Sequence, residues 1–322
     1  MLLGFRQYLH NLHSFEDLRQ ILKYAENSPL MEEGNCEVFI ALCGENPRTV
    51  LQKENLEPDV ALYDYSHLHL SPSQCVKRLI ADYHDHAFLK IIHYSRFPEG
   101  LTYPIDLFTQ MAAFMNYDHL AVSDSDFQIS FAEIIRAFKY HIQESSSNRI
   151  TITFPRRYHR SLDPKNYPIN RWAMEDIENL YVYFLSNIKF LEMKLDIQSG
   201  LFFTNRMSNI LLDFNKVGKW VGNLHLAISL LRDPEIRVQQ IEVQTNPQND
   251  SSINFEVQCA KINELYDYYQ IPMENIIRIA LDNPRKYLMS DWSYSLPLPA
   301  IEATLQRIFE IYSHYKNPQA MA

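Results

Sequence analysis

The chain has 322 residues, 46% of them hydrophobic, which is enough for one large α/β domain with a helical appendage. Its 30 lysines and arginines against 39 aspartates and glutamates give a net charge of −9, which argues against a general nucleic-acid binder because phosphate contacts need clustered cations. No window approaches about 18 apolar residues, so no transmembrane segment is expected, and 4 scattered cysteines without metal spacing favour a reducing, cytoplasmic location.

The beginning of the chain predicts a helix followed by alternating strands and helices. Leucine and phenylalanine recur at three- and four-residue steps from Leu9 to Leu22, which is typical of an amphipathic helix, so residues 1–36 are expected to be a helical lead-in. Continuous apolar runs then predict buried strands at 38–42, 60–63 and 89–94. Proline in a first helical turn marks two helix starts, at Ser71-Pro72 and at Pro104.

A fourth apolar run, 120–122, ends in Asp124 and Asp126. Ligands of open α/β sheets bind at the carboxyl ends of strands, so the two carboxylates are expected at the ligand edge. Both can reach one hard cation such as Mg²⁺ or Mn²⁺, which takes further oxygens from substrate phosphates. The alternative is a strand end with two solvated aspartates, one of them capping the helix that starts near Ser130.

The rest of the chain adds strands and then helices. We expect a loop at 155–171 that is rich in lysine and arginine. Strands are expected at 150–154, 195–203 and 237–243, and helices at 130–142, 172–191, 207–217, 220–231, 256–269, 273–281 and 301–315. The alternation up to Asp126 predicts a mostly parallel sheet with helices on both faces, in a domain over 37–254, and a helical C-terminal segment over 255–322.

Glycine is scarce, with 7 in the chain, and the glycine-rich phosphate loops are missing from the sequence. Neither a dinucleotide fingerprint nor a P-loop is present, so a bound phosphate would need a metal or side chains. No Gly-x-Ser-x-Gly elbow is present either, which argues against a serine hydrolase of the α/β type.

The order of these pieces resembles a nucleotide-sugar glycosyltransferase of the GT-A fold, and in particular the retaining mannosylglycerate and glucosylglycerate synthase group. The resemblance rests on Asp124-Ser125-Asp126 after a buried strand, on a strand ending in Phe154-Pro155-Arg156-Arg157, and on the glycine-containing segment 196–202. It continues at Trp220-Val221-Gly222-Asn223-Leu224, where family members read Trp-x-x-Asp-x-Leu.

The resemblance implies a GT-A (Rossmann-like) sheet and a metal-dependent transfer of sugar from a nucleotide diphosphate sugar to a small-molecule acceptor. Mn²⁺ or Mg²⁺ would neutralise the leaving diphosphate. Retention is expected because no carboxylate obviously stands as acceptor base, and arginines would bind an anionic acceptor. The implied residues are Asp124, Asp126 and Asn223 for catalysis; Ala41, Cys43, Glu45, Asp64, Asp124 and Ser125 for the donor; Asp124, Asp126 and Asp250 for the metal; and Arg156, Arg157, Gln198, Gly200 and Trp220 for the acceptor.

Two departures from the family pattern bear on activity. Asn223 stands where the family has a carboxylate, and an amide cannot act as a base. The family's third metal ligand is a histidine after the strand at 237–243, but the segment 243–254 contains none. Asp250 or Asn246 can supply an oxygen ligand instead, and His225 is a further, weaker candidate.

Two other function classes stay open, the first because of these departures and the second because a strand followed by Asp-x-Asp also occurs in phosphohydrolases. One is a catalytically inactive module of the same fold that binds a nucleotide or a protein. The other is a phosphohydrolase with an aspartyl nucleophile, although Gln128 stands where that motif wants threonine or valine. Self-association through the C-terminal helices is also compatible with the sequence.

Overall fold

The computed structural model describes residues 1–9, 19–21, 23–24, 36–44, 46–53, 60–83, 89–95, 100, 102–125, 129–145, 148–158, 169–186, 195–207, 212–214, 217–245, 255–288 and 296–315. These residues form one eight-stranded mixed sheet in the order β3-β4-β2-β1-β5-β7-β6-β8. The strands are β1 (Leu2–Leu9), β2 (Glu37–Gly44), β3 (Val60–Asp64), β4 (Leu89–His93), β5 (His119–Asp124), β6 (Thr151–Tyr158), β7 (Phe202–Asn205) and β8 (Arg237–Gln244).

Most neighbouring strands of the sheet are parallel, and β7 is the exception. β7 runs antiparallel to both β5 and β6, whereas the pairs from β3 through β5 and the pair β6–β8 are parallel. The carboxyl ends of β1, β2, β3, β4 and β5 therefore lie along one edge of the sheet. This confirms the mostly parallel sheet that the βα alternation predicts.

The N-terminal residues correct one expectation. Leu2–Leu9 is a strand, not part of a helical lead-in, and it lies between β2 and β5 with both ladders parallel. Leu3 and Phe5 face one hydrophobic cluster and Leu2 the other, as expected for a central strand with both faces covered. The predicted strand at 150–154 is also longer, because Pro155 to Tyr158 continue the ladder with β8.

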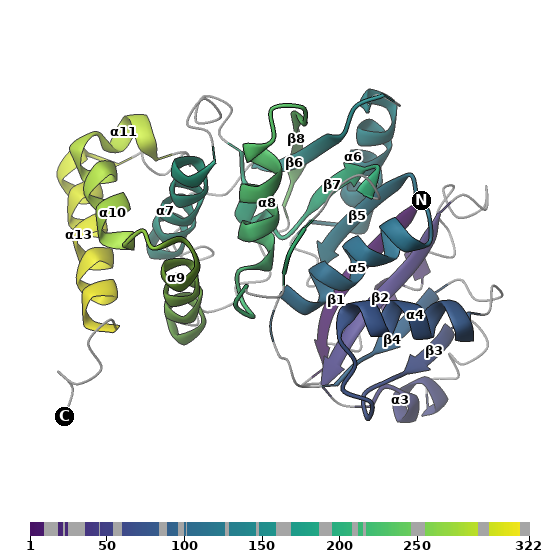
Figure 1. The fold of residues 1–322 in the computed structure, drawn as a ribbon. Coiled ribbons are helices and arrows are strands. Elements are labelled where there is room, and N and C mark those ends of the chain that lie inside the picture. Colours follow the sequence, from purple (N-terminus) through teal and green to yellow (C-terminus); the bar gives the residue numbers. More distant parts are fainter. Residues whose placement is uncertain are drawn as a thin grey trace.

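Helices cover both faces of the sheet, and the C-terminal helices form a helical part beside it (Figure 1). The described helices include α3 (Arg48–Lys53), α4 (Pro72–Asp82), α5 (Thr102–Phe114), α6 (Phe131–Glu144), α7 (Ile169–Leu185), η3 (Ile197–Ser199), α8 (Gly222–Arg232), α9 (Phe255–Tyr269), α10 (Met273–Asp282), α11 (Pro284–Tyr287) and α13 (Leu298–Tyr315). The expected helix at 207–217 is not formed at residues 212–214 and 217, which are described and irregular.

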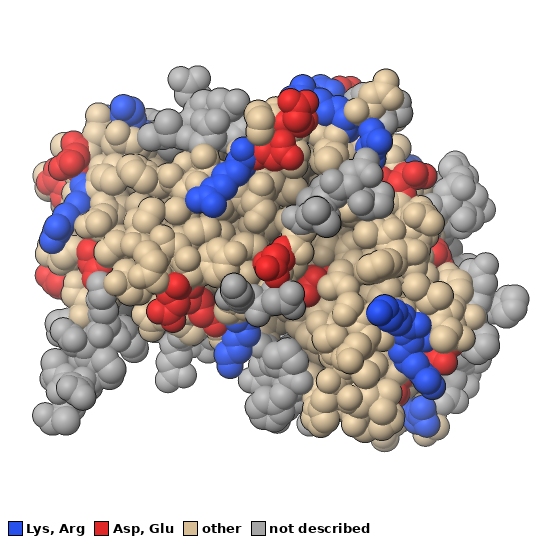
Figure 2. Space-filling model, viewed as in Figure 1, with Lys and Arg blue, Asp and Glu red and all other residues tan. Residues whose placement is uncertain are grey.

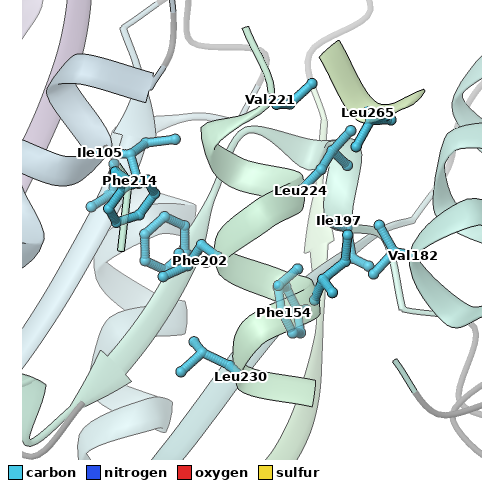
Figure 3. Packing of buried hydrophobic residues seen from close by; sticks show 14 of the residues in the cluster. Ile105, Phe154, Val182, Ile197, Phe202, Phe214, Val221, Leu224, Leu230 and Leu265 are labelled. Atoms are coloured by element: carbon cyan, nitrogen blue, oxygen red, sulfur yellow. The ribbon is translucent and has the colours of Figure 1, made fainter. Parts of the chain in front are cut away.

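Two hydrophobic clusters separate the faces of the sheet. Phe131, Ile134 and Phe138 of α6 pack on one face. The other face carries a larger cluster that includes α4, α5, α7, α8, α10 and α13. Figure 3 shows part of this cluster around a central helix, with Ile105, Phe202 and Phe214 on one side of it and Ile197, Val182 and Leu265 on the other.

The C-terminal helices are joined to the rest of the fold through α7. Residues 173–183 of α7 are buried on every side, and α10 and α13 pack against this helix. The predicted helical C-terminal segment is therefore present and shares the larger hydrophobic cluster. No helix in the described parts of the chain is long and apolar enough to cross a membrane.

Candidate functional site

The centre of the candidate site is an ion pair at the carboxyl edge of the sheet. Asp124 is the last residue of β5 and lies opposite Arg6 of β1 in the parallel register. Arg6 Nη2 is 2.5 Å from Asp124 Oδ1, and the side chains are 5% and 39% exposed. A buried cation thus holds a carboxylate that still faces outward, as a ligand-binding edge residue should.

Gly200 completes this arrangement by its backbone. Its φ of 72° is in the left-handed region, and an added Cβ would lie 2.1 Å from Asp124 Oδ2. Arg6 Nη2 also donates to the Gly200 carbonyl oxygen at 3.1 Å. Only glycine combines this conformation with so close an approach, and the structure thus places Gly200, which was predicted to bind the acceptor, beside Asp124.

The turn that carries Gly200 is braced from within by α7. Arg157 donates from Nε to Asp196 at 2.6 Å and from Nη2 to Glu175 at 2.7 Å, and all three side chains are at most 9% exposed. Asn179 Oδ1 accepts from the Ile197 amide at 3.1 Å. Glu175 and Asn179 are four residues apart on one face of α7.

Arg157 therefore has an internal role in this structure. Its guanidinium group binds Asp196, the first residue of the turn, and is therefore not free to bind an acceptor as predicted. Its neighbour Arg156 is half-buried on the same strand, where successive side chains point to opposite faces. Of the two arginines predicted to bind the acceptor, only Arg156 has a side chain that could still reach one.

The segment before α8 is pinned between two other elements. Glu264 of α9 accepts from the amides of Lys219 and Trp220 at 3.0 and 2.8 Å. Thr102 donates its amide to the Lys219 carbonyl oxygen and its hydroxyl to that of Gly218. Burial raises the pKa of the Glu264 carboxyl, and the Trp220 and Lys219 amides counter that rise. The predicted acceptor residue Trp220 is thus held by its backbone.

Two further predicted residues carry buried polar atoms with no hydrogen-bond partner among the described residues. They are Gln198, through Nε2, and Asn223, through Oδ1. Gln198 lies in η3 and Asn223 in the first turn of α8, and η3 packs against α8. Most buried polar atoms of this kind are hydrogen-bonded in native proteins, so each is expected to have a partner that is not among the described residues.

The predicted donor residues of β2 and β3 lie farther away. Ala41 is fully buried in the hydrophobic cluster, and Cys43 is 4% exposed near the end of β2. Asp64 ends β3, four strand positions from β5, which is about 19 Å along the edge. There Asp64 accepts from Ser66 and pairs with His93 at 3.1 Å. Burial raises the pKa of Asp64, but the Ser66 hydrogen bonds and His93 outweigh it and leave the pKa lowered.

Several predicted site residues lie outside the described residues, namely Glu45, Asp126, Asn246 and Asp250. Ser125 is described and buried, and its amide donates to the Arg6 carbonyl oxygen, so it continues the ladder between β5 and β1. His225 lies within hydrogen-bonding distance of the Tyr269 hydroxyl, 2.9 Å from Nδ1, and burial lowers its pKa. This places His225 in a packed aromatic cluster.

The described donor set fits a divalent cation in part. Asp124 offers a half-exposed carboxylate, but its Oδ1 is engaged by Arg6. Among the described residues, no group of three or more His, Cys, Asp or Glu is placed to hold a metal ion. A cation here would need oxygens from Asp126, from the predicted ligand Asp250 or from a bound phosphate.

Sequence reasoning missed Arg6 and Glu264. The signal for Arg6 was its position directly after the apolar run from Leu2 to Phe5. A cation in a buried strand is unusual unless its charge is paired. Glu264 carried no local signal, because its partners are backbone amides of another segment.

Comparison with known proteins gives matches to solved structures only. No family model and no curated protein sequence matches the chain. Two similar structures are of glucosyl-3-phosphoglycerate synthase from Mycobacterium tuberculosis, one with Mn²⁺, UDP and glucosyl-3-phosphoglycerate and the other with Mn²⁺, UDP-glucose and phosphoglyceric acid. Their TM-scores are 0.45 and 0.41 at 12% identity, each over 84% of this chain and 80% of the other. The present chain has a mostly parallel eight-stranded sheet with flanking helices.

Proposed function

We propose that the chain is a glycosyltransferase that uses a nucleotide diphosphate sugar, with Asp124-Ser125-Asp126 at the donor diphosphate. The observation that carries this proposal is the meeting of Asp124, Arg6 and Gly200 at the carboxyl edge of the sheet. A carboxylate presented beside a close backbone approach suits a ligand with hydroxyl and phosphate groups.

The residues divide by chemistry. Asp124 would accept hydrogen bonds from hydroxyl groups of the donor or share a cation with Asp126, and Asp250 or Asn246 would add an oxygen ligand. A bound Mn²⁺ or Mg²⁺ would stabilise the charge that develops on the leaving diphosphate. Gln198, Trp220 and Asn223 would contact the sugars, whose hydroxyl groups could pair with Gln198 Nε2 and Asn223 Oδ1, two buried atoms that have no partner among the described residues. Transfer with retention is proposed because Asn223 cannot serve as an acceptor base.

The acceptor is proposed to be a small anion such as glycerate or a phosphoglycerate. The half-buried Arg156 is the side chain that would bind it, since guanidinium groups bind carboxylate and phosphate in bidentate geometry. Arg157 supports this role indirectly, through the turn that it holds.

A catalytically inactive nucleotide-binding module is the second candidate, and one observation favours it. Arg6 neutralises Asp124, which weakens the attraction of this carboxylate for a metal cation. On this alternative the site would bind a nucleotide without turning over a sugar donor.

The test is nucleotide release from UDP-, GDP- and ADP-sugars with Mn²⁺, with and without glycerate or 3-phosphoglycerate. We expect release with one donor, loss of most of it in Asp126→Ala, and a larger effect of Arg156→Ala on acceptor use than on donor hydrolysis. Arg307→Ala, an exposed arginine of α13, is the control and should match wild type. Release equal to that of Asp126→Ala across the whole panel would reject the enzyme, and nucleotide binding without release would establish the second candidate.

A further inference from the structure

Arg6 is a buried cation whose hydrogen-bonding capacity is only partly used. It is 6% exposed and lies near the carboxyl end of β1, between β2 and β5. Nη2 serves both Asp124 and the Gly200 carbonyl oxygen. Nε and Nη1 are buried and have no hydrogen-bond partner among the described residues.

Such a state is unfavourable for a guanidinium group. A buried donor without an acceptor loses its hydration and gains nothing in return, and the loss is largest for charged groups. The pairing with Asp124 offsets the charge but leaves the N–H groups of Nε and Nη1 without an acceptor among the described residues. An acceptor rich in oxygen atoms would satisfy them.

The surroundings of Arg6 indicate what kind of acceptor fits. The Arg6–Asp124 pair is neutral as a unit and lies at the ligand edge, so an additional anion meets no net repulsion there. Two more buried polar atoms have no hydrogen-bond partner among the described residues: one is on Gln198 of η3, two positions before Gly200, and the other on Asn223 of α8, which packs against η3. Phosphate oxygens match unused guanidinium N–H groups in geometry and charge.

We propose that Arg6 is a phosphate ligand of this site and binds a diphosphate directly, beside the carboxylate that it holds in place. The proposal depends on the proposed function only for the identity of the natural ligand, the diphosphate of a sugar nucleotide. Arg6 would bind the leaving group from the sheet side, as a fixed cation that needs no metal. Asp124 would then face hydroxyl groups, with its orientation set by Arg6 and Gly200.

The direct test uses inorganic pyrophosphate as the probe, with metal removed by EDTA, in titration calorimetry at low ionic strength. Wild type is expected to bind pyrophosphate, and Arg6→Gln should bind it about 10- to 100-fold more weakly, because one charged set of donors is lost. Arg307→Gln removes an exposed arginine elsewhere and should bind as wild type does. No binding by wild type, or equal binding by Arg6→Gln, would overturn the proposal.

A second variant covers the case in which Arg6→Gln fails to fold, which circular dichroism would reveal. Asp124→Asn keeps the shape of the side chain and removes the charge that neutralises Arg6. Metal-free pyrophosphate should then bind roughly 3- to 10-fold more tightly, because one nearby negative charge is gone. Unchanged or weaker binding would count against Arg6 as a phosphate ligand.

The same variants separate this proposal from the proposed function. If pyrophosphate depends on Arg6 while no nucleoside diphosphate or sugar nucleotide binds with Mn²⁺, the phosphate site stands and the sugar-nucleotide function fails. If sugar nucleotides bind wild type and Arg6→Gln equally, the donor site stands and the role of Arg6 is rejected.

Discussion

Arg6 Nη2 and Asp124 Oδ1 lie 2.5 Å apart on two adjacent parallel strands, at the row where β5 ends. The pair joins the start of the chain to the carboxylate motif that the sequence marks as its chemical centre. Because Gly200 contacts both partners, three segments remote in sequence meet at one point. On the face shown in Figure 2, the charged residues are scattered in small groups.

The contact between Gly200 and Asp124 predicts a coupled effect of substitution. Gly200→Ala should destabilise the fold by about 1–3 kcal/mol, from backbone strain and from the clash with Asp124 Oδ2. In an Asp124→Ala background only the strain remains, so the cost should fall. Urea denaturation of the four proteins measures the difference. Additivity within about 0.5 kcal/mol would mean that the two residues do not touch.

The two neighbouring arginines of β6 should respond very differently to truncation. Arg157→Ala leaves Asp196 and Glu175 buried without their cation and should cost about 3–5 kcal/mol of stability. Arg156→Ala, the matched control on the same strand, should stay within about 0.5 kcal/mol of wild type. Thermal and chemical denaturation provide both values. A small cost for Arg157→Ala would place its guanidinium in solvent and return it to the list of acceptor ligands.

His141 predicts an acid-sensitive fold. It is fully buried beside Phe138 and Phe203, and burial, with help from His119, lowers its pKa to about 3. Since the unfolded chain takes up the proton near pH 6.5 and the folded chain does not, stability is lost as pH falls from about 6.5 towards 3. Over this range His141 lowers the free energy of unfolding by about 1.4 kcal/mol for each pH unit.

Replacing the ring tests this directly. His141→Phe keeps the aromatic packing, and Thr153 keeps its hydrogen bond to Gln239, so the variant should fold. Its free energy of unfolding should fall less steeply than that of wild type between pH 6 and 4. His67→Gln, at an exposed position, is the control and should leave the slope unchanged. Parallel curves for wild type and His141→Phe would exclude this source of acid sensitivity.

Glu264 predicts a link between α9 and the segment of Trp220. Glu264→Ala removes the acceptor of the Lys219 and Trp220 amides and should cost about 1–2 kcal/mol. Hydrogen exchange of these two amides should accelerate while exchange in β5 stays slow. Asp267→Asn, exposed on the same helix, is the control. Unchanged protection of both amides in Glu264→Ala would contradict the contact.

The sequence alone determined most of the elements, because hydrophobic periodicity and capping are local. The apolar runs of β2, β3, β4 and β5 and the proline-marked start of α4 lie where the sequence predicts them, with Ser71 as a capping residue. It also placed Asp124 at the end of a buried strand, since a charged residue after an apolar run ends burial. From these features the mostly parallel sheet followed.

The tertiary structure decided everything that depends on partners distant in the chain. Leu2–Leu9 is a strand because β2 and β5 supply both of its ladders, whereas the helical spacing of apolar residues begins only at Leu9. Arg157 turned inward because Asp196 and Glu175, from other segments, meet it in the core. Arg6 became part of the site for the same reason. The charge of a buried arginine must be met by whichever carboxylate the sheet brings opposite to it, and only the strand order made that residue Asp124.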